Sequence, residues 1–185
     1  MELDKCISGR RSIRKYKDTA IPREIIDKLL RAGVNAPSGM NAQPWNFVVI
    51  ENKDMIGDLS KKVKSLLING PWPEEMKKAF QSDKDVIFYG APLLILISVP
   101  KNEQMRSVNL LDCGLAAENM FLAAYQEGLG SCFIGFASFL NQSPKVLADL
   151  GIPEGYELMA PLIFGYPDGN PSSKPREAKI LKWIK

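Results

Sequence analysis

The feature that most constrains the fold is an almost entirely apolar run, PLLILISV, at residues 92–99. Its residues do not alternate between polar and apolar, which is typical of a strand that is covered on both faces. The run is far too short to cross a bilayer, and Pro100 and Lys101 end it. The sequence therefore predicts a strand buried in the middle of the molecule.

Hydrophobic periodicity predicts helices and strands that alternate irregularly along the rest of the chain. Helices are predicted at residues 21–34, 54–68, 107–127 and 143–151, with another beginning at 73–75. Further strands are predicted at residues 46–51, 131–136 and 157–165. This order favours an α+β fold with a mixed sheet of four or five strands. Because we see no repeat and no linker, residues 1–185 are predicted to form a single domain.

The chain of 185 residues contains no histidine, which excludes several kinds of site. Ser-His-Asp catalysis, Cys-His catalysis and imidazole metal ligands are all impossible, and we expect no metal site. Cys6, Cys113 and Cys132 lie far apart without a C-x-x-C motif, which predicts free thiols in a reducing compartment. The N-terminus has no apolar stretch typical of a secretory signal, so the predicted location is the cytoplasm.

Positive charge is concentrated near the N-terminus, although the net charge is only +3. Five of the 24 Lys and Arg residues lie within residues 10–17. Guanidinium groups bind phosphate through paired hydrogen bonds, and Ser12 adds a hydroxyl group. In an extended backbone, Arg10, Ser12 and Arg14 would point to one side and Arg11 to the other. The segment predicts an anion pocket; a solvated basic turn, or weak attraction to membrane or nucleic acid, is the alternative.

A polar loop, APSGMNAQPWN at residues 36–46, joins the first predicted helix to the first predicted strand. It holds four neutral polar side chains: Ser38, Asn41, Gln43 and Asn46. Such groups can contact the carbonyl and imide edges of a planar heterocycle without adding charge. The alternative interpretation is a well-capped turn.

Two later segments have features of a ligand site. The glycines of GLGSCFIGF, at residues 128–136, would let a flat ligand approach the backbone closely. They follow a helix and begin a strand, so they are not a Rossmann motif, and a simple helix stop is the alternative. Lys174 and Arg176 form a second cationic pair in a proline-restricted tail. The final ILKWIK predicts a tail that lies on the body of the protein or on a partner subunit.

Taken in this order, the segments resemble the nitroreductase family of FMN-dependent oxidoreductases. The resemblance extends from Arg10 to Arg176. It rests on RRSIRKY, on APSGMNAQPW, on the D-x-G-x-A-x-E-N helix at residues 112–119 that leads to GLG, and on GYP followed by KPR. It implies an α+β sandwich with a central mixed, mostly antiparallel sheet flanked by helices. It also implies an intertwined homodimer with one FMN at each of two sites between the subunits.

The resemblance further implies which residues bind FMN. Residues 10–14 and 174–176 would hold the phosphate and the flavin edge. The loop at residues 37–43 would reach FMN largely from the other subunit, and residues 134–135 would lie against the ring. The implied set comprises Arg10, Arg11, Ser12, Arg14, Pro37, Ser38, Asn41, Gln43, Ile134, Gly135, Lys174 and Arg176.

The implied activity is ping-pong transfer of hydride from NADH or NADPH, through FMN, to a small acceptor such as a quinone or a nitroaromatic compound. No catalytic side chain is required, because the flavin carries the redox chemistry. A cation beside the ring would stabilise reduced flavin, and Arg10, Arg14 or Lys174 could supply it. Reductive dehalogenation, desaturation, flavin breakdown and a redox module with little turnover are the alternatives. Neither nucleic acid nor membrane is an expected partner. The segment at residues 69–90 corresponds to the part of such proteins that covers the substrate and that differs among them.

Overall fold

The computed structural model describes residues 2–169, 171 and 176–185. Its centre is a four-stranded sheet in the order β1-β2-β4-β3. The strands are β1 (Asn46–Ile50), β2 (Leu93–Pro100), β3 (Gly130–Phe133) and β4 (Tyr156–Gly165). All three neighbouring pairs are antiparallel, and a parallel pairing occurs as an isolated bridge between Ser12 and Ser131. The predicted α+β class with a mostly antiparallel sheet is confirmed.

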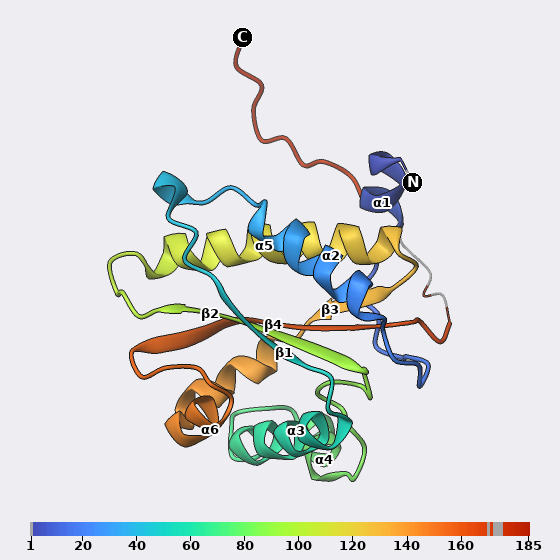
Figure 1. Ribbon diagram of the computed structural model, residues 1–185, viewed down its shortest axis with the longest axis vertical. Helices are drawn as coiled ribbons and strands as arrows, with labels where there is room; N and C mark the ends of the chain where they lie inside the picture. Colours follow the sequence, from blue (N-terminus) through green and yellow to red (C-terminus); the bar gives the residue numbers. More distant parts are fainter. Residues whose placement is uncertain (1, 170, 172–175) are drawn as a thin grey trace.

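Helices cover both faces of this sheet (Figure 1). The α-helices are α1 (Leu3–Gly9), α2 (Arg23–Val34), α3 (Lys53–Leu67), α4 (Glu74–Gln81), α5 (Arg106–Gln126) and α6 (Pro144–Asp149). Two 3₁₀ helices, η1 (Gly39–Asn41) and η2 (Gly135–Gln142), complete the described elements. Helices α2 and α5 lie on one face, and α3, α4 and α6 lie on the other (Figure 1). None of the helices in the described ranges is both long enough and apolar enough to span a membrane.

Strand β2 explains why two layers of helices are needed. Residues 93–99 are each at most 1% exposed. Leu93, Ile95 and Ile97 pack in the core formed with α2 and α5, whereas Leu94 and Leu96 pack in the core formed with α3. Each such side chain contributes about 1.5–3 kcal/mol on burial. The apolar run therefore requires protein on both faces, as predicted.

The structure differs from the prediction in two places, at helix α1 and at the end of strand β3. Helix α1 was not predicted, because Cys6 is its only buried residue and its sequence shows no apolar stripe. The strand predicted at 131–136 ends at Phe133, since η2 begins at Gly135. The other predicted helices and strands are present, with ends shifted by a few residues.

The C-terminal residues 176–185 form no regular secondary structure and extend away from the body of the protein (Figure 1). Four apolar side chains in this tail are 62–103% exposed: Ile180, Leu181, Trp183 and Ile184. The described tail therefore does not lie on the body of its own chain.

Candidate functional site

The basic N-terminal segment is attached to the edge of the sheet. The backbone N–H of Ile13 donates to the carbonyl of Ser131 at 2.9 Å, and Ile13 is buried. A Cβ at Gly130 would collide with the Ile13 side chain, so Gly130 is required for this close approach. The attachment fixes the backbone from which Ser12 and Arg14 extend.

Arg10 and Arg11 already have partners within the chain. Arg10 Nε donates to Glu118 Oε1 at 3.1 Å, and its guanidinium lies 6.0 Å from the centre of the Phe121 ring. Arg11 Nη1 donates to the carbonyls of Ser8 and Arg10. The positive charge of Arg10 is therefore offset by a carboxylate of α5.

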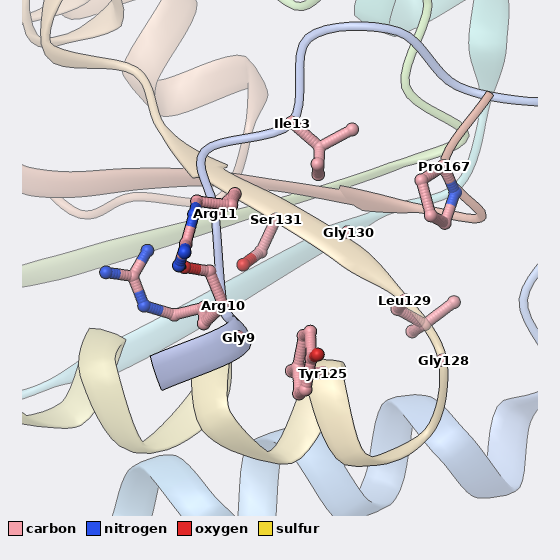
Figure 2. A pocket seen from close by; sticks show the side chains of 10 residues that line it. All are labelled: Gly9, Arg10, Arg11, Ile13, Tyr125, Gly128, Leu129, Gly130, Ser131 and Pro167. Atoms are coloured by element: carbon pink, nitrogen blue, oxygen red, sulfur yellow. The ribbon is translucent and has the colours of Figure 1, made fainter. Parts of the chain in front are cut away.

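Both arginines line a hollow of ≈ 250 Å³ between the N-terminal segment, the end of α5 and β3 (Figure 2). Tyr125 forms its floor in this view, and the hydroxyl of Ser131 points toward the arginines (Figure 2). The predicted glycine-rich turn at residues 128–130 also lines this hollow. The structure thus brings together the basic segment at residues 10–17 and the glycine-rich segment at residues 128–136.

Arg14 differs from Arg10 because no Asp or Glu of the described residues forms an ion pair with it. Its guanidinium lies 5.9 Å from the centre of the Tyr89 ring. The neighbouring Lys15, in contrast, pairs with Asp168 at 2.6 Å. Arg14 therefore keeps an uncompensated positive charge at the surface.

Two hollows meet at Arg14. One of ≈ 440 Å³ is lined by Ser12, Lys15 and Asp168, and the other of ≈ 260 Å³ is lined by Tyr89, Ile134 and Gly135. The structure therefore brings together four of the predicted site residues: Ser12, Arg14, Ile134 and Gly135.

Gly135 leaves the backbone open on this side. A Cβ at Gly135 would meet no heavy atom within 4 Å, and the residue is exposed. The preceding Ile134 is buried, and its N–H donates to the carbonyl of Pro161. Rigid backbone with an uncovered face can receive the flat face of a ligand.

The polar loop is strongly ordered by its own hydrogen bonds. Ser38 Oγ accepts from the N–H of Gln43 at 2.9 Å, and Gln43 Nε2 donates to Asn41 Oδ1 at 3.1 Å. Met40, Asn41 and Gln43 all have φ between 47° and 55°, in the left-handed region. These contacts agree with the alternative interpretation of a well-capped turn. Pro37, Asn41 and Gln43 are nevertheless exposed, so the polar groups of this loop remain accessible to a ligand.

This loop and the basic segment contact different parts of α5. Gly39 contacts Asp112 toward the start of the helix, whereas Arg10 contacts Glu118 and Phe121 toward its end. One copy of the chain thus does not place the loop in the hollows beside Arg14. Of the C-terminal pair, Arg176 is exposed and Lys174 lies outside the described residues.

The sequence interpretation missed Tyr89, which forms part of the site beside Arg14. A turn was recognisable only from the following Gly90, and no periodicity indicated that the tyrosine faces a cation.

Two ionisable groups behind the site, Tyr16 and Cys132, have raised pKa values because burial disfavours their charged forms. Both therefore stay protonated near neutral pH.

The sequence model of the family described as Nitroreductase family matches residues 7–166. The chain is 28% identical to a protein of Methanothermobacter thermautotrophicus provisionally named NADH dehydrogenase/NAD(P)H nitroreductase, over 99% of this chain and 88% of that protein. It is also 27% identical to iodotyrosine deiodinase 1 of Rattus norvegicus, over 99% of this chain and 68% of that protein.

A solved structure shows the same similarity in three dimensions. The crystal structure of a nitroreductase with bound FMN from Bacteroides fragilis superposes with a TM-score of 0.88 at 28% sequence identity. The match covers 100% of both chains.

Proposed function

The chain belongs to the nitroreductase family, and from this premise we propose that it is an FMN-dependent oxidoreductase that uses NADH or NADPH. Bound FMN would supply the redox chemistry, which is acceptance of a hydride from the nicotinamide and delivery of two electrons to a small acceptor. The proposed acceptors are quinones and nitroaromatic compounds.

The observation that carries this proposal is the pairing of an uncompensated cation with an open backbone face. Arg14 has no carboxylate partner among the described residues, and Gly135, across the same hollow, presents no side chain. An anionic cofactor with a flat ring requires both features. The residues present therefore fit FMN.

Each predicted contact has a role in this proposal. Ser12 and Arg14 bind the phosphate or the flavin edge, and Ile134 and Gly135 support the ring. Arg10 also binds the cofactor, with its side chain held in place by Glu118. Arg11 binds it from the adjoining hollow of ≈ 250 Å³. Lys174 and Arg176 complete the phosphate site from the C-terminal tail.

We propose that the active form is a homodimer. The loop with Pro37, Ser38, Asn41 and Gln43 lies away from Arg14 in its own chain, so a second copy would bring it to the flavin. Helix α5 supports this arrangement because Leu110, Leu111 and Leu115 are 46–68% exposed. An exposed apolar helix face together with an exposed apolar tail is typical of a protein interface.

The described cysteines are all free and buried, which is consistent with the proposed cytoplasmic location. Because their side chains are buried, a substrate cannot reach them, and we assign the redox step to the flavin.

A second candidate is reductive dehalogenation, which the similarity to iodotyrosine deiodinase 1 favours. It would use the same FMN site with a halogenated aromatic acceptor. Steady-state assays with NADH or NADPH distinguish the two candidates. Turnover of menadione with parallel double-reciprocal plots supports the quinone reductase; release of halide from a halogenated phenol without menadione turnover supports the alternative.

A further inference from the structure

The sequence offers three cations as neighbours of the flavin, and the structure distinguishes two of them, Arg10 and Arg14. Arg10 is paired with Glu118, and Lys174 lies outside the described residues. Arg14 lacks a carboxylate partner in the described part of the chain and lies over the Tyr89 ring. On the basis of the proposed FMN function, we propose that Tyr89 is a positioning residue. Its ring holds the guanidinium of Arg14 at the hollow, where the positive charge stabilises the reduced cofactor.

An aromatic ring suits this purpose better than a carboxylate. A ring face attracts and orients a guanidinium without neutralising its charge. A carboxylate would also orient Arg14, but it would cancel the positive charge that reaches the ligand. Preorganised charge is what stabilises negative charge that develops during a reaction. The contact with Tyr89 therefore keeps Arg14 both ordered and fully charged.

Tyr89 has an unusual backbone conformation that fixes the direction of its ring. Its φ is 57°, and the next residue, Gly90, has a φ of 64°. A left-handed conformation is uncommon for a bulky residue and persists only where its surroundings impose it. The half-buried tyrosine lines the ≈ 260 Å³ hollow together with Arg14 and Gly135.

Asp85 imposes this conformation on the turn. Its Oδ2 accepts from the N–H of Gly90 at 3.0 Å, and its Oδ1 accepts from the N–H of Phe88 at 2.8 Å. Ser60 of α3 donates its hydroxyl to the same Oδ1 at 2.6 Å. The carboxylate thus joins the turn on both sides of Tyr89 to helix α3.

A buried lysine attaches the preceding part of this segment to the same helix. Lys64 is 8% exposed, and its Nζ donates to the carbonyls of Ser82 at 2.6 Å and Lys84 at 3.1 Å. Helix α3 therefore holds the chain rigidly on the approach to Tyr89. The segment at residues 69–90 fixes a charged group of the site in addition to covering the sheet.

The test compares two substitutions of Tyr89 in the full-length protein loaded with FMN. Tyr89→Asn removes the ring but introduces a residue that tolerates the left-handed conformation. We expect a more negative midpoint potential of bound FMN and a dissociation constant for FMN roughly threefold to tenfold higher. Tyr89→Phe keeps the ring face, so both quantities should match the wild type. If Tyr89→Asn does not fold, Tyr89→Gly replaces it with the same expected result.

A double-substitution cycle shows whether Tyr89 acts through Arg14. In an Arg14→Met background, Tyr89→Asn should cause no further shift of the potential. An equal shift with and without Arg14 would overturn the inference, as would an unchanged potential in Tyr89→Asn. A wild-type protein that takes up no FMN would instead refute the proposed function itself, and the inference with it. The two failures are therefore distinct.

Discussion

The backbone N–H of Gly39 donates to both carboxylate oxygens of Asp112, at distances of 3.1 and 3.3 Å. Asp112 is 4% exposed on α5, so this contact fixes the polar loop to the central helix. We expect Asp112→Ala to lower the free energy of unfolding by about 1–3 kcal/mol, because the Gly39 donor loses its acceptor. FMN binding should also weaken, since Ser38, Asn41 and Gln43 lie on the loop.

Asp112→Asn is the matched control, because its amide oxygen can still accept from Gly39. Urea unfolding and fluorescence titration with FMN measure the two effects. Equal losses in the Ala and Asn variants would show that the negative charge, rather than the hydrogen bond, holds the loop.

Arg14→Ala should weaken FMN retention. A hydrogen bond to a charged group contributes about 1.5–3 kcal/mol, which corresponds to roughly tenfold or more in the dissociation constant. Lys62→Ala is the control, because Lys62 lies on α3 and lines a different groove. Retention after gel filtration measures both variants, and equal FMN content in the two would contradict the assignment of Arg14.

Removal of residues 177–185 should weaken the homodimer while leaving Arg176 in place. The deleted tail carries Leu181, Trp183 and Ile184, which are at least 73% exposed in one chain. Burial of each such side chain against a partner contributes about 1.5–3 kcal/mol, so the dissociation constant should rise at least roughly tenfold. Lys182→Ala should have little effect. Sedimentation equilibrium measures the dissociation constant of the homodimer. An unchanged constant in the truncated protein would mean that other elements form the interface.

Stability should fall at alkaline pH. Burial raises the pKa of Cys113 to about 12, and it also raises the pKa values of Cys132 and Tyr16. Above the ordinary thiol pKa of 9.0, the unfolded chain releases protons that the folded chain retains. The free energy of unfolding therefore decreases as pH rises from about 9 toward about 12.

Urea unfolding on either side of this pH range measures the decrease in the free energy of unfolding. In Cys113→Ala this decrease should be smaller than in the wild type. A free energy of unfolding that is constant across the range would mean that these groups titrate normally in the folded protein.

The fold was largely predictable because its strongest signals are local. The apolar run at residues 92–99 defined β2, and the stripe of Ile26 and Leu29 defined α2. Helix α1 was not predictable, since Cys6 alone anchors its short sequence in the core. Chain order also could not reveal that, within the described residues, the parallel pairing is confined to the bridge between Ser12 and Ser131.

The candidate site was predictable only where a motif carried it. Ser12, Arg14 and Gly135 stand in such motifs, and the structure brings them together around two adjoining hollows. Tyr89 depends on long-range geometry, because the hydrogen bonds of Asp85 and Ser60 orient a turn far from Arg14 in sequence. The pairing of Arg10 with Glu118 likewise joins residues 108 positions apart. Hydrophobic periodicity along the sequence cannot reveal contacts between residues that lie so far apart in the chain.

The visible absorbance spectrum of the purified protein tests the central claim most directly. We expect the bands of bound, oxidised flavin, and we expect NADH or NADPH to bleach them in the absence of oxygen. A colourless preparation that takes up no added FMN, or a bound flavin that neither nucleotide reduces, would contradict the account.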